Sequence, residues 1–294
     1  IYTSNEKHDD DCNHCKENKT EEIGDSLNNK DCRHDKHCNE KSKEDCKEHK
    51  DCRHDEENKK DDKIEKSENN DCNGACDLKQ KNKGPAGARN AGIRRSTGPF
   101  IAFLDSDDSW AEGKLSEQIK EMTANPDYLV SHTDEEWYKN GRLLNQKNKH
   151  KKPRGYIFDK CLSLCAVSMS TVMIRRELFD RAGFFDETFP CCEDYEFWLR
   201  VSAKEKFLFI EKPLTFKDGG RPDQVSSLYS TGIDRFRIRA IKNLLETNSL
   251  DTEQKTLAIR ELEKKCRIYG NGCVKHGRKD EGFEYLNLPA RYRN

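Results

Sequence analysis

The 294-residue sequence lacks a long hydrophobic run, and it lacks an excess of charge of either sign. No apolar stretch approaches the roughly 18 residues that a membrane-spanning helix requires. The formal net charge is -1, so no surplus of lysine or arginine indicates nucleic acid as a partner. The first residues, Ile1 to Ser4, also lack the basic and then apolar pattern of a secretion signal. These absences predict a cytoplasmic protein that does not bind nucleic acid.

Motifs for two widespread kinds of catalysis are missing as well. No Ser/His/Asp or Cys/His arrangement lies beside a nucleophile turn, which disfavours covalent catalysis by a serine or cysteine. No glycine-rich loop carries the lysine of a P-loop. A catalytic site in this chain is therefore expected to use residues other than a serine or cysteine nucleophile or the lysine of a P-loop.

Large aliphatic and aromatic side chains are scarce in residues 1–80, a segment that is rich in charge. Ordering a residue costs about 1 to 2 kcal/mol, and so few apolar side chains cannot offset that free energy over the whole segment. They stand at six positions, which are Ile1, Tyr2, Ile23, Leu27, Ile64 and Leu78. The segment is therefore predicted to be either solvated and of low complexity or held together by metal ions.

Cysteine and histidine recur in this segment, which holds eight of the 14 cysteines. The unit Asp31-Cys32-Arg33-His34-Asp35 reappears at residues 51–55. Thiolates and imidazoles together suit zinc, and the candidate ligand groups are Cys12/Cys15, His34/His37/Cys38 and Cys46/His49/Cys52. Only the first pair has the tight spacing of a zinc finger. Reduced thiols in a solvated segment are therefore the favoured interpretation, with zinc binding as the alternative.

After Lys83 the sequence alternates apolar strands, amphipathic helices and turns, which is typical of an α/β protein. A loop that enters a helix is predicted at residues 84–92. Strands are predicted at 100–104, 128–131, 170–174, 206–210 and 214–216. Helices are predicted at 114–122, 176–182 and 193–203 and through most of 233–285. Residues 81–230 are thus expected to form an α/β region, and residues 231–294 a helical C-terminal extension.

An acidic run, Asp105-Ser106-Asp107-Asp108, follows the apolar strand predicted at 100–104. Ligands of open α/β sheets bind outside the carboxyl ends of strands. Mg²⁺ or Mn²⁺ prefers oxygen ligands, so these carboxylates with phosphate oxygens would form a metal site for a nucleotide diphosphate. The alternative is a helix cap, because Asp107, Asp108 and Ser109 precede a predicted helix.

Two further elements carry candidate functional residues. The segment Gly84 to Ile93 combines small residues, which let phosphates approach the backbone, with the cation of Arg89. Glu193 and Asp194 begin a predicted helix, where a carboxylate would accept a proton from a substrate hydroxyl. Taken alone, the first element is open to explanation by tight helix packing, and charge at a helix N-terminus is the favoured explanation of the second.

Together the three elements resemble the family 2 glycosyltransferases, whose GT-A fold is a nucleotide-binding α/β sandwich with a mixed sheet. The resemblance extends over residues 82–230. The matching segments are Asn82 to Ile93, Gly98 to Trp110, Lys114-Leu115, Ser170 to Arg176, Gly183 to Glu187 and Cys192 to Arg200.

On the donor side, the resemblance implies a nucleotide-diphosphate sugar as the substrate. Asp105 and Asp107 would form the metal-binding DxD element with Mg²⁺ or Mn²⁺, and Asp108 would support them. Arg89 would contact the nucleotide or its phosphates, and Arg221 would face phosphate from a glycine-rich loop.

On the acceptor side, the resemblance implies that Asp194 is the general base of an inverting transfer to a glycan or lipid-linked acceptor. Glu193 and Gln224 would lie beside the acceptor. Polysaccharide synthesis at the inner face of the membrane is the implied setting. Beside Phe236 stand three arginines, Arg235, Arg237 and Arg239. They could contact a lipid-linked acceptor at the membrane surface, although a solvated helix face is the favoured interpretation.

One part of the family pattern is not recognisable in residues 1–80. Family members begin with two apolar strands and a pair of aspartates that hold the nucleoside, and this segment lacks the apolar runs for those strands. Two alternatives to an active transferase therefore stay open. They are a catalytically impaired interaction protein and a Cys/His metal-binding module at the N-terminus.

Overall fold

The computed structural model describes residues 2–4, 65–66, 78–219, 228–229 and 231–293. Most of the segment predicted to be of low complexity, including all of its candidate zinc ligands, lies outside the described residues. Two residues predicted at the site, Arg221 and Gln224, also lie outside them.

Within the described residues, seven strands form one mixed sheet in the order β1-β4-β8-β6-β9-β5, with β7 paired to β6. Strands β6 and β9 are parallel, and the other pairs are antiparallel. The seven strands are β1 (Tyr2–Ser4), β4 (Phe100–Ala102), β5 (Asp108–Trp110), β6 (Val130–Lys139), β7 (Arg142–Leu144), β8 (Val172–Arg175) and β9 (Phe207–Gly219). A separate antiparallel pair consists of β2 (Glu65–Lys66) and β3 (Leu78–Lys79). The predicted α/β class with a mixed sheet is confirmed.

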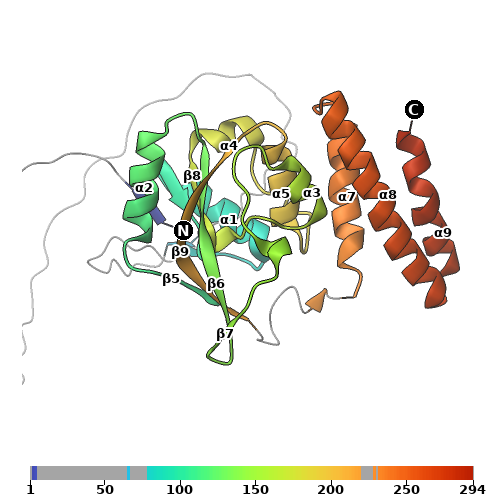
Figure 1. Ribbon diagram of the computed structural model, residues 1–294, viewed down its shortest axis with the longest axis horizontal. Coiled ribbons are helices and arrows are strands. Elements are labelled where there is room, and N and C mark those ends of the chain that lie inside the picture. The colour runs from blue at the N-terminus through green and yellow to red at the C-terminus, as the bar shows by residue number, and fades with distance from the viewer. Residues whose placement is uncertain (1, 5–64, 67–77, 220–227, 230, 294) are drawn as a thin grey trace, which may run out of the picture. The chain divides into compact units, whose positions relative to one another are not determined.

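Helices cover the sheet and then continue past it to the C-terminus (Figure 1). Those of the α/β region are α1 (Gly84–Arg95), α2 (Lys114–Ala124), α3 (Phe158–Ser163), α4 (Glu177–Ala182) and α5 (Glu193–Ser202). The predicted helical extension is present as α7 (Ile233–Glu246), α8 (Thr252–Lys275) and α9 (Lys279–Asn287). Three short 3₁₀ turns complete the set, and they are η1 (Asn148–His150), η2 (Met169–Thr171) and η3 (Leu288–Tyr292).

Strand β4 shows why the run at residues 100–104 is wholly apolar. Phe100 and Ala102 lie in a small core with Met122 of α2, whereas Ile101 and Phe103 lie in the large core that contains α5 and α7. Successive side chains of a strand point to opposite faces, so a sheet covered on both faces needs apolar residues at every position. The strand ends at Ala102, two residues earlier than predicted, and Phe103 and Leu104 connect it to the acidic run.

The acidic run does not lead into a helix, and so the helix-cap alternative is wrong. Asp108 is the first residue of β5, and α2 begins only at Lys114. The residue before α2 is Gly113, which has a φ of 79° and no side chain with which to cap the helix. A separate strand, not a helix N-terminus, therefore holds Asp108.

Two other expectations need correction. The segment predicted to be a loop entering a helix at 84–92 is helical from Gly84 onward, and Pro85 stands in the first turn, where its missing N–H costs no helical hydrogen bond. The strands predicted at 206–210 and 214–216 form the single strand β9. Its register with β6 shifts near Pro213, where the missing N–H interrupts the ladder without ending the strand.

A buried lysine stands at the start of α2, beside Trp110 of β5. Lys114 is 1% exposed, and its Nζ donates to Gln118 Oε1 at 2.5 Å and lies 4.4 Å from the ring centre of Trp110. Gln118 in turn donates to Ser131 Oγ and to the carbonyl of Thr171, both at 3.0 Å. Burial lowers the pKa of Lys114 to about 7.

The Lys114→Met variant is expected to remove a dependence of stability on pH. In the unfolded chain Lys114 titrates near its ordinary pKa of about 10.4, so at intermediate pH the unfolded state binds more protons and stability rises with pH. From about pH 7.5 to 9, the free energy of unfolding of the wild type should rise by about 2 kcal/mol relative to the variant. Urea unfolding at several pH values measures this difference, and parallel curves for the two proteins would contradict the assignment.

Candidate functional site

Arg89 joins three segments that are far apart in the sequence. From helix α1, its Nη2 donates to Asp105 Oδ1 at 2.9 Å, and its Nη1 donates to Glu193 Oε1 at 2.5 Å. Asp105 stands just beyond strand β4, and Glu193 is the first residue of α5. The small-residue segment, the acidic run and the start of α5 therefore meet at one guanidinium, as the sequence pattern predicts.

Burial makes these contacts electrostatically strong. The side chains of Arg89 and Glu193 are 13% and 7% exposed, while Asp105 is 35% exposed. Burial opposes the charge on Arg89, but Asp105 and Glu193 outweigh it and raise the pKa of the guanidinium. Burial, followed by the charge of Asp194, raises the pKa of Glu193, and Arg89 offsets only part of that effect. Arg89 is thus a fixed cation among carboxylates.

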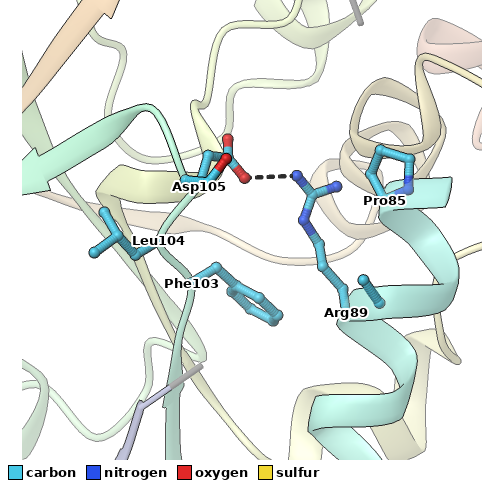
Figure 2. A pocket seen from close by; sticks show the side chains of 7 residues that line it. Pro85, Arg89, Phe103, Leu104 and Asp105 are labelled. Carbon is cyan, nitrogen blue, oxygen red and sulfur yellow. Dashed lines mark hydrogen bonds and ion pairs between the residues drawn. The ribbon is translucent and has the colours of Figure 1, made fainter. Parts of the chain in front are cut away.

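A cavity of about 300 Å³ opens beside Arg89 and Asp105. Pro85, Ala88 and Ser106 are among its other lining residues. Figure 2 shows the Arg89 guanidinium reaching from α1 toward the Asp105 carboxylate, with Phe103 below them. The small side chains of α1 leave this space open, which is what a bulky anionic ligand near Arg89 would need.

A second cavity, of about 390 Å³, lies on the other side of the acidic run. Asp107 and Asp108 line it, together with Tyr138 of β6 and with Phe216 and Lys217 of β9. Ser106 lines both cavities. Of the two predicted metal ligands, Asp105 thus lines the first cavity and Asp107 lines the second.

Asp108 has a different environment from its neighbours in the run. Its side chain is 2% exposed, and its Oδ2 lies 3.5 Å from Lys217 Nζ. Burial raises the pKa of Asp108, and the cation of Lys217 lowers it in part. Asp108 is thus a buried partner of Lys217.

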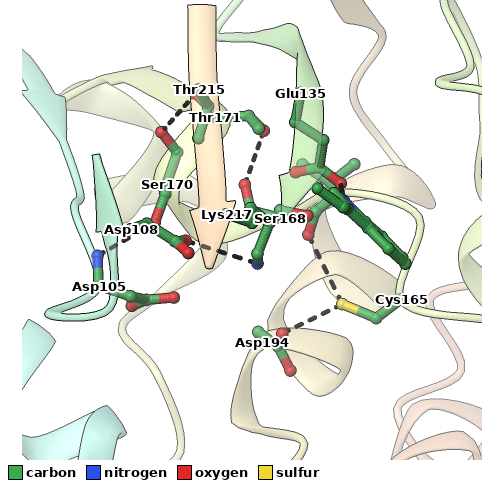
Figure 3. Close-up of polar contacts among 12 residues, drawn as sticks. Asp105, Asp108, Glu135, Cys165, Ser168, Ser170, Thr171, Asp194, Thr215 and Lys217 are labelled. Atoms are coloured by element: carbon green, nitrogen blue, oxygen red, sulfur yellow. Dashed lines mark hydrogen bonds and ion pairs between the residues drawn. The ribbon is translucent and has the colours of Figure 1, made fainter. Parts of the chain in front are cut away.

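Two lysines that no sequence motif indicated, Lys152 and Lys217, form ion pairs with buried carboxylates near the acidic run. Lys152 Nζ lies 2.7 Å from Glu135 Oε1, and both side chains are almost fully buried. Although burial alone would raise the pKa of Glu135, Lys152 and Lys217 lower it. The pKa of Lys217 is raised because Asp108 and Glu135 outweigh its own burial. Figure 3 shows Asp108 and Lys217 in contact, with Glu135 nearby.

Asp194 is held by two donors at the start of α5. Its Oδ1 accepts from the backbone N–H of Tyr195 at 2.7 Å, and its Oδ2 accepts from Cys165 Sγ at 3.1 Å (Figure 3). Burial, and then the charge of Asp194, raise the pKa of the Cys165 thiol well above its ordinary value, so it stays a protonated donor. Cys165 was not predicted as a site residue, and it lies 29 residues from Asp194 in the sequence.

The balance of charge at the site favours a cation. Carboxylates from the acidic run, from Glu135 and from the start of α5 outnumber the cations Arg89, Lys152 and Lys217. Among the residues with described side chains, no three or more His, Cys, Asp or Glu residues are arranged to hold a metal ion by themselves. A divalent cation bound here would therefore take part of its oxygen ligands from a substrate.

No helix in the described part of the chain is long and apolar enough to cross a membrane.

Part of this chain is similar to one family of known proteins. Residues 60–183 match the family model described as glycosyl transferase family 2. An uncharacterized glycosyltransferase of Rickettsia bellii is 38% identical over 141 residues, which are 46% of this chain and 19% of that protein. The UDP-Glc:α-D-GlcNAc-diphosphoundecaprenol β-1,3-glucosyltransferase WfgD of Escherichia coli is 35% identical over 122 residues, which are 40% of this chain and 44% of that protein. The match thus spans less than half the length of these relatives.

Solved structures were also compared. The crystal structure of S. aureus TarS in complex with UDP-GlcNAc aligns with a TM-score of 0.45 and 18% identity, over 74% of each chain.

Proposed function

Because the chain belongs to glycosyltransferase family 2 through residues 60–183, we propose that residues 81–230 transfer a sugar from a nucleotide-diphosphate donor to an acceptor hydroxyl. The observation that carries this proposal is the pair of contacts from Arg89 to Asp105 and Glu193. These contacts bring the residues expected at the donor together with the start of α5, where Asp194 stands.

The names of two E. coli relatives specify UDP-glucose and a diphosphoundecaprenol-linked acceptor. A nucleotide sugar and a glycan or lipid-linked acceptor are accordingly the substrates proposed for this chain.

The cavity beside Arg89 is the proposed site of the donor diphosphate. Arg89 is the cation that would contact phosphate oxygens, because its planar fork of N–H groups matches their geometry. The surplus of carboxylates around the acidic run fits a divalent cation, which Asp105 and Asp107 would hold. Such an ion, when bound, would neutralise negative charge on the leaving nucleotide.

Asp194 is the proposed general base. It would take the proton of the acceptor hydroxyl, and the acceptor oxygen would then form its bond to the anomeric carbon. The bond from that carbon to the phosphate oxygen breaks, and its electron pair leaves with the nucleotide. Attack in line with the leaving group inverts the anomeric centre. Tyr195 N–H and Cys165 Sγ hold the carboxylate in one orientation, which general base catalysis requires.

The test of this function is turnover by the intact chain. UDP-glucose, UDP-N-acetylglucosamine and GDP-mannose are each incubated with Mg²⁺ or Mn²⁺, and release of nucleotide diphosphate is measured with and without a lipid-diphosphate-linked sugar. The proposal expects metal-dependent release from one of these donors and its loss in Asp107→Ala. The matched control is Asp159→Ala, which removes a half-exposed carboxylate on α3. No release from any donor, with no nucleotide bound, would reject the proposal.

Cys165 is expected to act as a positioning residue for Asp194. Replacing it with alanine removes one of the two donors, so kcat should fall about tenfold, the effect of losing one hydrogen bond worth about 1 to 1.5 kcal/mol. The KM for the donor sugar should stay unchanged, because Cys165 does not line the cavity beside Arg89. The variant Cys165→Ser keeps a donor and should recover most of the rate. Steady-state kinetics of both variants provide the check, and equal losses in the two would indicate a packing role instead.

A further inference from the structure

We propose that a cavity between α7 and the C-terminal segment binds a phosphate ester that carries an apolar group. The cavity has a volume of about 340 Å³ and is separate from the two cavities at the acidic run. Helix α7 contributes five of its lining residues, and α9 and η3 contribute the other four. Figure 1 shows α7, α8 and α9 beyond the sheet. This site is independent of the proposed glycosyl transfer.

The basic residues of α7 share one face at this cavity. Arg235, Arg239 and Lys242 follow one another at intervals of four and three residues, which places them on the same side of a helix. The sequence grouped Arg237 with Arg235, but Arg237 instead lies 3.4 Å from Asp234 and over the ring of Tyr195. Across the cavity, η3 adds the cation of Arg291.

The charge of the cavity is largely unbalanced. Within the described residues, neither Arg235 nor Arg291 forms an ion pair with a carboxylate, and Glu284 is the one acidic residue that lines the cavity. Lys242 lies 3.8 Å from Glu246, but both side chains are about half exposed, so that pair contributes little. The cavity therefore has a net positive charge and favours an anion.

One of these cations is already fixed in place. Arg239 donates from Nη1 to the carbonyl of Thr188 at 3.2 Å and from Nη2 to the Thr188 hydroxyl. Its guanidinium also lies 4.2 Å from the ring centre of Phe189. A guanidinium that is held before binding loses less entropy when a ligand arrives, and its remaining N–H groups match the oxygens of a phosphate.

The remaining walls of the cavity are apolar. Phe236, Ile238 and Leu288 line it together with Tyr285, and the guanidinium of Arg235 lies 4.5 Å from the ring centre of Phe236. An inorganic anion would leave this apolar surface uncovered, whereas a phosphate ester with an apolar substituent would cover it. Both a phospholipid headgroup and a soluble phosphate ester have this chemistry.

The experiment compares two double variants of the intact chain. Arg235→Gln/Arg291→Gln removes two cations from the cavity, and Arg260→Gln/Arg267→Gln removes two exposed cations from α8 as a matched control. Phenyl phosphate is the soluble probe, and its binding is measured by calorimetry. Vesicles of phosphatidylglycerol, or of phosphatidylcholine alone, are the lipid probes, and co-sedimentation measures their binding. Thermal unfolding of each variant reports whether it folds as the wild type does.

The proposal expects phenyl phosphate to bind the wild type and the control alike, and the cavity variant at least about tenfold more weakly. Binding to phosphatidylglycerol vesicles that the cavity variant alone loses would identify a lipid headgroup as the source. Binding of phenyl phosphate without vesicle binding would identify a soluble ester. No binding of either probe, or equal binding by the two double variants, would overturn the proposal.

Discussion

Replacing Arg89 with methionine is expected to lower the free energy of unfolding by about 3 to 5 kcal/mol and to abolish sugar transfer. The variant leaves Glu193, whose side chain is 7% exposed, without its counter-charge, and it also removes the partner of Asp105. A buried carboxylate without a partner is far more costly than the lost attraction itself. Urea unfolding followed by circular dichroism measures the change in stability, and nucleotide release measures the change in activity.

The control for Arg89 stands on the same helix. Arg94 is 54% exposed and lies 3.6 Å from Glu187, so Arg94→Met should change stability by no more than about 1 kcal/mol and leave turnover intact. The double variant Arg89→Met/Glu193→Gln removes the unpaired buried charge as well, so it should recover part of the stability but none of the activity. Equal stability of Arg89→Met and Arg94→Met would show that the contacts of Arg89 do not hold the three segments together.

The Asp194→Asn variant is expected to lower kcat about a hundred- to ten-thousandfold, the usual contribution of a general base. Asparagine has the shape of aspartate, and its amide oxygen can still accept from Tyr195 N–H, so the start of α5 should keep its structure. Because Asp194 is not among the residues that line the cavity beside Arg89, binding of the donor nucleotide should be unchanged.

Single-turnover kinetics with saturating donor separate this loss of rate from a loss of binding. The matched control is Asp180→Asn on α4, which makes the same change at an exposed position. A variant Asp194→Asn that transfers sugar at the wild-type rate would remove Asp194 from the role of base and leave Glu193 as the nearest other carboxylate at the start of α5.

The sequence was most informative where a local pattern determines the environment. The apolar run at residues 100–104 predicts a strand covered on both faces, and the two cores on either side of β4 confirm it. The helical spacing of apolar residues in 233–285 likewise predicts α7 and α8. In both cases the spacing of apolar residues within a single strand or helix determines which of its side chains are buried.

The sequence was least informative where a contact depends on how distant strands align. Glu135 and Lys217 stand in strands with many polar residues. The parallel pairing of β6 with β9 brings Glu135 near Lys217, and the antiparallel pairing of β5 with β9 places Asp108 opposite Lys217. Cys165 lies outside every motif, so nothing local indicates its bond to Asp194. The assignment of Asp108 to a strand also depended on a distant partner, since β5 exists only as a neighbour of β9.

The most direct test of the central claim is calorimetric titration of the intact chain with UDP and GDP, in the presence and absence of Mn²⁺. The site built around Arg89 and the acidic run predicts that one nucleotide binds in a metal-dependent way. It also predicts that Asp107→Ala and Arg89→Met each lose this binding, whereas Asp159→Ala keeps it. No heat of binding with either nucleotide, or undiminished binding by Asp107→Ala, would contradict the account.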